Sequence, residues 1–583
     1  MTKTKPKDKK RPPNTAQIDN NIILTADVLL SLNDYATNRN LNVLIDGGPG
    51  TGKSRGYIIP NLLNANASFC ITDPKGELLR CCGTFLKRLG YKIKIFNLDN
   101  MQNSSNYNPF NYVYDSEGKL DYNAIKKMIT VLMKNVAGGD SKNKSSDPYW
   151  DTSAEKLITS IAILLLEEGA KSQQNFATVA EKMRNIEFPT DPKDTNFKSK
   201  LDMEFDILED KNPESLGVLL YREFKQGAGK TMKSVISVAN SKLQDFNLPN
   251  VKNLTHCDNI GIETLGDKDQ KTALFIIIPA SDTSFNFLAA MMYTQMFDIL
   301  YQKALSLPKK RLLTHVRFLL DEFANVGTIP GFDNLITTMR SMGISANVVV
   351  QSIAQLETMY DENRWKTVIA GCDSFLFLGG QDEPTLDYVS KRLGKETIDI
   401  VSRGQTKSYR QNSTNVNNAL HGRELLTTDE LAKLDNANCI LFVRGYNPFY
   451  SKKYSLEDHP NYEYTALYDE KLAYDVLGIE TVTLPKMTPA EKEVHQNELR
   501  FETAEPSDGA AVNQSVLDGI MKMKLIEKSV CGGINLSFDT TVPRTAVIEG
   551  GEVYSFSDFS FSGKNSAQAE QNYDYYNAKE MFS

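Results

Sequence analysis

The stretch LNVLIDGGPGTGKS, residues 41–54, decides the fold. Its first six residues are an apolar run bounded by Asn and Gly, which is typical of a strand buried on both faces. The next eight fit the pattern GxxxxGK followed by Ser or Thr, and RGYIIPNLL then reads as a helix start. A glycine-rich turn in this position lets backbone N–H groups approach phosphate oxygens without clashes from Cβ atoms. We therefore predict a phosphate-binding loop over residues 47–54.

The residues of this loop have distinct predicted roles. Lys53 is expected to reach the β- and γ-phosphates of a nucleotide, and the Ser54 hydroxyl to ligate Mg²⁺. The N-terminus of the following helix adds partial positive charge. The rest of the cradle is formed by Gly47, Gly48, Pro49, Gly50, Thr51 and Gly52. A second GKT, at residues 229–231, lacks the earlier glycine and a preceding strand, so we predict an ordinary helix start there.

A strand that ends in two acidic residues is the partner that such a loop requires. In VRFLLDEFAN, residues 316–325, the hydrophobic strand runs directly into Asp321 and Glu322. At the carboxyl end of a strand beside the loop, Asp321 is expected to hold the Mg²⁺ shell. Glu322 is placed to orient or deprotonate an attacking water. The alternative is an acidic pair at a surface strand end, without a catalytic role.

Two further polar residues are candidates for the same site. Gln351 ends the apolar run ANVVVQ, where its side chain is expected to hydrogen-bond the γ-phosphate or the water. Arg340 lies on the helical segment FDNLITTMRSM, between the strands that carry Asp321 and Gln351. Phosphoryl transfer calls for an additional cation, which Arg340 is a candidate to supply to a neighbouring subunit. The alternatives are a polar strand terminus for Gln351 and a solvated helix arginine for Arg340.

The fold class follows from the alternation of apolar strands with amphipathic helices. Besides residues 41–46, we predict buried strands at residues 68–73, 91–98, 272–279, 316–321, 346–351, 374–379 and 439–445. Continuously apolar strands that alternate with helices imply a mostly parallel sheet with helices on both faces, an α/β architecture.

The chain organisation is less uniform than this rhythm suggests. Few strands are expected between residues 110 and 265, and we predict an all-α domain, 111–264, inserted between 20–110 and 265–480 of the nucleotide-binding domain. Residues 1–19 are expected to form a flexible basic arm, either solvated or in contact with DNA or anionic lipid. Residues 481–583, with 9 basic and 15 acidic side chains for a net charge of −6, are expected to form an acidic, partly disordered tail.

Composition excludes several classes of protein. The chain of 583 residues is 41% hydrophobic and 24% charged, as expected for a globular protein of several domains. Its apolar runs fall short of the roughly 20 residues that a bilayer requires, and no signal peptide is predicted. Seven cysteines without a CxxC motif and five histidines make a zinc or disulfide framework improbable and point to reduced thiols in a cytosol.

Together these residues resemble the TraG/VirD4 family, the coupling ATPases of type IV secretion and conjugation. Beyond the phosphate-binding loop, ITDPKGELLR (71–80) is similar to the family's second-strand motif, and YNPF (107–110) to an element before its helical domain. The most specific block is FLLDEFANVGTIPGF (318–332) with VVVQSIAQLETMY (348–360). The segments GRELLTTDEL (422–431) and LFVRGYNPF (441–449) resemble the closing part of the family. The likeness covers roughly residues 20–480 and is greatest to coupling proteins of Gram-positive conjugative elements.

The resemblance implies a RecA-like P-loop NTPase domain with an inserted all-α domain. It implies ATP and Mg²⁺ as cofactors, a homo-hexamer with a central channel and nucleotide sites between subunits, so that Arg340 would act in trans. It also implies delivery of a relaxase–DNA substrate to a membrane secretion channel. Family members usually begin with transmembrane helices, and none is predicted here. We therefore expect a cytoplasmic member that a separate anchor protein recruits to the inner face of the membrane.

Two functions of different class remain open at this stage. The first is an ATP-hydrolysing motor that pumps single-stranded DNA, with the polar segment Arg403–Asn418 as a candidate phosphate contact because it carries Arg403, Lys407 and Arg410 and no acid. A solvated loop explains that segment equally well. The second is a nucleotide-switched receptor that docks protein substrates. A chromosome-segregation or phage-type DNA pump is disfavoured by the block at residues 318–360.

Overall fold

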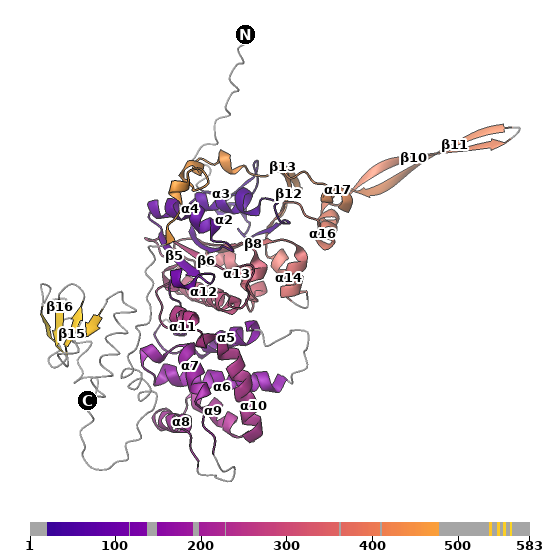
Figure 1. The fold of residues 1–583 in the computed structure, drawn as a ribbon. Coiled ribbons are helices and arrows are strands. Elements are labelled where there is room, and N and C mark those ends of the chain that lie inside the picture. The colour runs from indigo at the N-terminus through magenta and orange to yellow at the C-terminus, as the bar shows by residue number, and fades with distance from the viewer. Residues whose placement is uncertain are drawn as a thin grey trace, which may run out of the picture. The chain divides into compact units, whose positions relative to one another are not determined.

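The computed structural model describes residues 20–115, 117–136, 148–189, 197–227, 229–360, 363–408 and 411–476, and four short strands between residues 536 and 562. Up to residue 476 the described residues form two compact units, 20–99 with 262–476 and 100–261 (Figure 1). The predicted basic arm lies outside the described residues. So does the predicted acidic tail, apart from those four strands.

The first unit is built on a nine-stranded sheet in the order β13-β12-β9-β3-β8-β7-β4-β6-β5. Seven neighbouring strands, from β9 to β5, are parallel, whereas β12 pairs antiparallel with β9 and β13 antiparallel with β12. All eight strands predicted from apolar runs are present, which confirms the mostly parallel α/β fold. Their bounds are β3 Val43–Asp46, β4 Ser68–Thr72, β5 Lys92–Asn97, β6 Thr272–Ile277, β7 Val316–Leu320, β8 Ile344–Val350, β9 Ser374–Phe377, β12 Asn438–Val443 and β13 Phe449–Lys452.

Helices cover both faces of this sheet. The crossovers through α3 and α4 run toward β5, whereas those through α12, α13 and α14–α15 run the opposite way along the strand order. Because parallel crossovers are right-handed, the two groups lie on opposite faces, and Figure 1 shows α3 and α4 on one side and α12, α13 and α14 on the other. Their bounds are α3 Ile59–Leu63, α4 Glu77–Arg88, α12 Asn286–Ser306, α13 Phe332–Met342, α14 Ile353–Met359 and α15 Arg364–Ala370.

The strand order brings four chain segments to one edge of the sheet. β3, β8, β7 and β4 are consecutive neighbours and run in the same direction. The residues that follow them therefore emerge together at their carboxyl ends, where ligands of open α/β sheets bind. The phosphate-binding loop, Gln351, Asp321 and Asp73 all follow these strands directly.

A long antiparallel ribbon corrects one expectation. β10 (Lys395–Ser408) and β11 (Gln411–Glu424) pair along their whole length and project away from the sheet (Figure 1). Residues 403–408 and 411–418 therefore lie on paired strands and not on an irregular polar loop, whereas Arg410 lies outside the described residues. The segment is rich in Ser, Thr and Asn and lacks the alternation of apolar and polar residues that usually signals a strand. For residues 402–408 and 411–418 only the backbone is described.

Smaller elements complete the first unit. A hairpin and a helical turn precede the sheet, namely β1 (Asn21–Ile23), β2 (Leu29–Ser31) and α2 (Asp34–Thr37). The ribbon is flanked by α16 (Glu383–Leu393) and α17 (Thr428–Ala432). After β13, residues 453–476 run over α4 and over the loop helix, which is the helical segment that follows the phosphate-binding loop. They contain three short 3₁₀ turns, η8 (Leu456–Asp458), η9 (Tyr462–Tyr464) and η10 (Glu470–Leu472).

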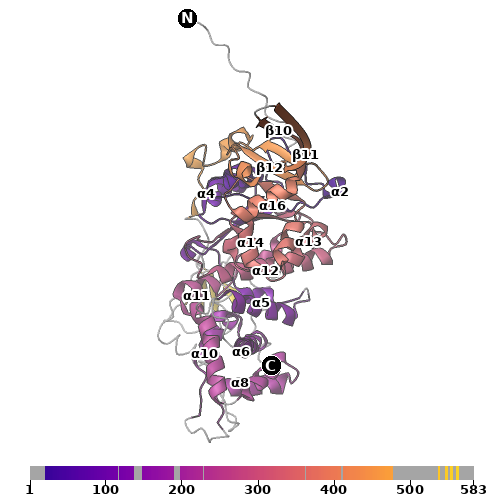
Figure 2. The ribbon, with the colours of Figure 1, turned by 90° about the vertical axis from the view of Figure 1, so that its right-hand side faces the viewer.

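The second unit, residues 100–261, is helical throughout its described part, with one isolated β-bridge between Tyr114 and Leu120. The apolar helix α6 packs against α5, α7, α9 and α10. Figure 2 shows α5 and α10 beside α6. A buried Lys182–Glu204 ion pair of 2.6 Å links α7 to α8. Bounds are α5 Tyr122–Asn135, α6 Pro148–Glu167, α7 Phe176–Arg184, α8 Lys200–Lys211, α9 Leu216–Lys225, α10 Gly229–Leu243 and α11 Pro249–Thr255. The second GKT opens α10, as predicted.

The four strands near the C-terminus form an antiparallel meander: β14 Leu536–Phe538, β15 Thr545–Ile548, β16 Glu552–Ser555 and β17 Ser560–Ser562. Among the described residues, no helix combines the length and apolar character that crossing a bilayer requires.

Candidate nucleotide-binding site

The phosphate-binding loop lies where the sequence predicts it, between β3 and the wide helical turn η1 (Ser54–Ile58) that leads into α3. The sheet holds its start, because the N–H groups of Gly47 and Gly48 donate to the carbonyls of Val350 and Gly379 at 3.2 and 3.0 Å. A Cβ atom on Gly47 would lie 2.5 Å from the Thr51 Oγ1 atom, so this position requires glycine. The loop therefore closes tightly on itself at the end of β3.

Lys53 folds back over the loop. Its Nζ atom donates to the carbonyl oxygens of Gly47 and Gly48 at 2.6 and 3.1 Å. Burial lowers the pKa of Lys53, although the carboxylates of Asp321 and Glu322 act in the opposite direction. The ammonium group thus spans the space in which phosphates bind in this type of loop.

Ser54 and Asp321 meet across the sheet edge. The Ser54 Oγ atom donates to the Asp321 Oδ2 atom at 3.1 Å, joining residues that are 267 positions apart in sequence. Asp321 is buried, and burial raises its pKa to about 6. A hydroxyl and a carboxylate oxygen in contact are hard donors of the kind that Mg²⁺ prefers, so these two side chains fit the predicted ion.

Glu322 is held in an unusual backbone conformation. Its φ angle of 47° places it in the left-handed region, which is strained for a residue with a side chain. Its N–H donates to Asp321 Oδ1 at 3.1 Å, and the Asn325 Nδ2 group donates to Glu322 Oε2 at 2.8 Å. Strain of this kind persists where surrounding contacts impose it, and here those contacts fix the carboxylate beside Asp321.

A cavity of about 370 Å³ opens beside these residues. Its walls come from the loop helix, the start of α4, the end of β7 and the segment after β13: Ser54, Arg55, Ile59, Asp73, Pro74, Lys75, Glu77, Leu78, Arg80, Cys81, Asp321, Glu322, Ala466, Leu467 and Glu470. Asp73 belongs to the predicted second-strand motif 71–80, but no role at the site was assigned to it from sequence. It accepts the Leu79 N–H at 2.8 Å, and burial raises its pKa to about 6. A polar residue at the end of a buried strand was the available signal.

Two further polar residues lie beside the loop, at the ends of β8 and β3. Gln351 directly follows β8, the neighbour of β3, and its N–H donates to Gln355 Oε1 at 2.9 Å. Asp46, the last residue of β3, was not predicted to matter. It is buried, with one carboxylate oxygen lacking a hydrogen-bond partner among the described residues, and burial raises its pKa to about 7. Asp382, the N-cap of α16, raises the pKa of Asp46 further.

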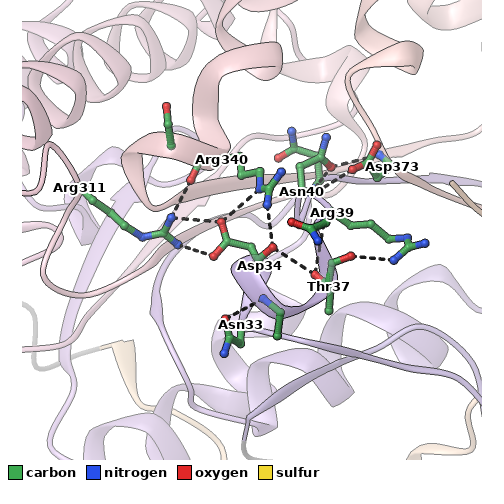
Figure 3. Close-up of polar contacts among 12 residues, drawn as sticks. Asn33, Asp34, Thr37, Arg39, Asn40, Arg311, Arg340 and Asp373 are labelled. Carbon is green, nitrogen blue, oxygen red and sulfur yellow. Dashed lines mark hydrogen bonds and ion pairs between the residues drawn. The ribbon is translucent and has the colours of Figure 1, made fainter. Parts of the chain in front are cut away.

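Arg340 lies away from this group of residues within its own chain. It occupies the last turn of α13, just before β8 begins, and therefore near the amino ends of the parallel strands. Figure 3 shows it pointing at Asp34 of α2, with Arg340 Nη2 donating to the Asp34 carbonyl at 2.7 Å and Nε 3.4 Å from Oδ2. Arg311 contacts both carboxylate oxygens of Asp34 at 3.1 Å. The structure therefore contradicts the alternative in which Arg340 is a solvated arginine on the helix surface.

The fold and the site define a class. A mostly parallel sheet, a phosphate-binding loop after β3, an acidic pair after β7 two strands away, and an all-α unit between β5 and β6 are the features of a RecA-like P-loop NTPase. The family model for "Type IV secretory system Conjugative DNA transfer" matches residues 17–468, and the chain belongs to this family.

Curated relatives agree with this assignment. Protein VirD4 of Rhizobium radiobacter is 24% identical over 416 residues, covering 69% of this chain and 55% of the relative. Conjugal transfer protein TraG of Escherichia coli is 23% identical over 430 residues, covering 69% of this chain and 65% of the relative. The matched region thus spans just over half to about two thirds of the length of these relatives.

Solved structures share the fold. The bacterial conjugative coupling protein TrwBdeltaN70, in its trigonal form in complex with sulphate, matches with a TM-score of 0.53 at 16% identity, covering 76% of this chain and 93% of that chain. The plasmid coupling protein TrwB in complex with the ATP analogue ADPNP matches with a TM-score of 0.52 at 17% identity, covering 74% and 89%. The likeness confirms the predicted fold class.

Proposed function

We propose that this chain is an ATP-hydrolysing coupling protein that recruits a relaxase–DNA substrate and delivers single-stranded DNA to a type IV secretion channel. Membership of the conjugative DNA transfer family supports the role in conjugation. The observation that carries the enzymatic part is the direct contact between Ser54 and Asp321, which line one cavity together with Glu322 and lie close enough to Lys53 to affect its pKa.

The residues divide the work at that cavity. Ser54 and Asp321 would hold Mg²⁺, which when bound neutralises charge on the β- and γ-phosphates. Lys53 exchanges its loop carbonyls for phosphate oxygens, and the loop amides orient the triphosphate. Glu322, fixed by Asn325, accepts the proton of the attacking water. Gln351 lies at the end of the strand between β3 and β7, from where it reports on the γ-phosphate.

Hydrolysis by the full chain, measured with and without single-stranded DNA, tests the proposal. Glu322→Gln removes the general base and should lower the turnover number by roughly 100-fold or more while nucleotide still binds. Glu357→Gln, an exposed glutamate on α14, is the matched control and should behave as the unaltered chain. Nucleotide binding without hydrolysis, in protein concentrated enough to assemble, would refute the enzymatic part.

The DNA response separates the two candidate functions. A rate that rises with single-stranded DNA, and that Glu322→Gln abolishes, supports a motor. A rate indifferent to DNA contradicts the motor and favours a nucleotide-switched receptor that docks protein substrates, in which the helical domain 111–264 or the acidic tail 481–583 would contact the relaxase.

Arg340 is proposed to complete the nucleotide site of a neighbouring subunit in a hexamer. Arg340 can leave Asp34 without stranding that buried carboxylate, because Arg311 contacts both of its oxygens. A complementation assay tests the role. Arg340→Ala and Lys53→Ala chains should each be inactive, whereas their mixture regains activity at sites that combine an intact Lys53 with a partner's intact Arg340. A mixture as inactive as its components would refute action in trans.

The β10–β11 ribbon is proposed to contact the phosphates of single-stranded DNA. Support comes from the sequence of residues 403–418, which carries three basic residues and no acid, and from the projection of the ribbon away from the sheet (Figure 1). The triple change Arg403→Gln, Lys407→Gln and Arg410→Gln should weaken DNA binding and flatten its dependence on salt. Unchanged affinity and salt dependence would exclude the ribbon as a contact.

Family membership also supports a proposal for the remaining partners. We place the protein in the cytoplasm at the inner face of the cell membrane, where a separate anchor protein and the secretion channel recruit it. Flotation of membranes from cells with and without the other transfer proteins tests this location.

A further inference from the structure

A lysine far from the motif in sequence holds the phosphate-binding loop from outside. Lys453 directly follows β13, and its Nζ atom donates to the Thr51 carbonyl at 2.8 Å. The same ammonium donates to Asn436 Oδ1 at 3.0 Å, and the Lys453 N–H donates to the Ala437 carbonyl at 2.9 Å. Burial lowers the pKa of Lys453. Both its backbone and its side chain are therefore fixed where it meets the loop.

The bond to Thr51 fixes the orientation of one peptide group. In a trans peptide the carbonyl of Thr51 and the N–H of Gly52 belong to the same plane and point in opposite directions. A carbonyl drawn outward to Lys453 consequently turns the Gly52 N–H to the other side of the loop, toward the phosphate cradle. That N–H has no hydrogen-bond partner among the described residues, so it is available to an anion.

This peptide has little intrinsic preference for one orientation, so an external restraint matters. Gly52 has a φ angle of +89°, and glycine adopts either sign of φ with nearly equal ease. The Thr51–Gly52 peptide can therefore turn over at little cost in backbone energy. If it turned over, a carbonyl oxygen would replace an N–H group at the phosphates, and attraction would become repulsion.

We propose that Lys453 is a positioning residue that keeps the Thr51–Gly52 peptide in its phosphate-binding orientation. The proposal rests on the proposed nucleotide-binding function and assigns a second lysine to the loop, one that acts through the backbone. Lys53 acts directly on phosphates, whereas Lys453 prepares the loop to receive them. Asn436 assists by orienting the Lys453 ammonium.

The test is the affinity for Mg-ADP, measured by calorimetry with the full chain. Lys453→Met should weaken binding by about tenfold, the effect of one lost hydrogen bond to a charged group. Lys453→Arg retains a donor and should restore much of the affinity. Asn436→Ala should weaken binding by a smaller factor. Lys452→Met alters the exposed preceding lysine of β13 and is the matched control.

Steady-state kinetics separate positioning from a general structural role. If Lys453 only pre-orients the loop, Lys453→Met raises KM for ATP by a similar factor while kcat at saturating ATP stays within about twofold of the control. The melting temperature without nucleotide should match that of Lys452→Met. Affinity equal to that of the control would overturn the proposal, as would an equal loss in stability and in kcat. Because ADP binding is measured without turnover, absent hydrolysis would refute the proposed function and leave this test intact.

Discussion

Buried carboxylates lie at both ends of the parallel strands, and their surroundings differ between the two ends. At the amino ends of the strands, Asp34 is paired with Arg311 and Arg340 (Figure 3). Asp373 is paired there with Arg444 at 3.0 Å. At the carboxyl ends, Asp321 is supported by a serine hydroxyl, and burial raises its pKa to about 6. The carboxylates at the amino ends are neutralised by arginines of the same chain, whereas Asp321 at the carboxyl ends is left short of positive charge. We propose that a Mg²⁺ ion supplies the missing positive charge.

The largest expected effect concerns Asp321. Asp321→Asn keeps the size and the contact with Ser54 but removes the charge that would hold Mg²⁺. Hydrolysis should fall by at least about 100-fold. The free energy of unfolding without nucleotide at pH 8 should rise by about 2 kcal/mol, because a buried and poorly compensated charge is removed. Denaturant titration beside the activity assay checks both. A loss of stability in Asp321→Asn would contradict the view that Asp321 is short of positive charge.

The same exchange of Asp for Asn at the amino ends of the strands should have the opposite effect on stability. Asp34→Asn leaves Arg311 and Arg340 without their carboxylate, and both side chains are largely buried, with 22% and 34% exposure. We expect a loss of about 2 to 3 kcal/mol in the free energy of unfolding, reduced from the value for fully buried pairs by this partial exposure.

The control for that loss is an exposed ion pair. Glu457 pairs with Arg55 at 3.1 Å, with 55% and 60% of the side chains exposed. Glu457→Gln should change the free energy of unfolding by less than about 1 kcal/mol. If Asp34→Asn and Glu457→Gln lowered the free energy of unfolding equally, the buried Asp34 carboxylate would not stabilise the amino ends of the strands.

Asp46 sharpens the comparison through pH. Burial and Asp382 raise its pKa to about 7, so the folded chain holds the Asp46 proton more tightly than the unfolded chain does. Its contribution to stability is complete below about pH 4 and is lost as pH rises toward 7. Asp46→Asn should therefore stabilise the chain by about 2 kcal/mol more at pH 8 than at pH 5. Unfolding titrations at the two pH values measure the difference, and the exposed Asp99→Asn is the control.

The smallest effect isolates backbone strain at the acidic pair. With φ at 47°, Glu322 occupies a conformation that glycine adopts without penalty. Glu322→Gly should be more stable than Glu322→Ala by about 1 kcal/mol, although both lose the carboxylate and hydrolysis. Two variants of equal stability would show that Asn325 and Asp321 do not impose a strained backbone there.

The parts predicted from sequence share a local signal. β3 with its glycine-rich loop, and β7 with Asp321 and Glu322, are each encoded in a stretch of fewer than twenty residues. Contacts between distant segments leave no such signal. The Lys453–Thr51 bond joins residues 402 positions apart, and the Arg340–Asp34 pair joins residues 306 apart. Likewise, β12 has the same apolar pattern as the parallel strands of this sheet, so nothing in its composition reveals that it runs antiparallel to β9.

The polar ribbon has a mechanical consequence. Each strand has 14 residues, and at about 3.3 Å per residue the ribbon extends roughly 45 Å from its base. At that base, Ser390 of α16 donates to the Leu426 carbonyl at 2.7 Å, and the N-cap of α16 is Asp382, two residues after Gly380 beside the loop. If the ribbon turned with α16 as one rigid body, a rotation of about 5° would displace its far end by about 4 Å, close to the separation of neighbouring strands.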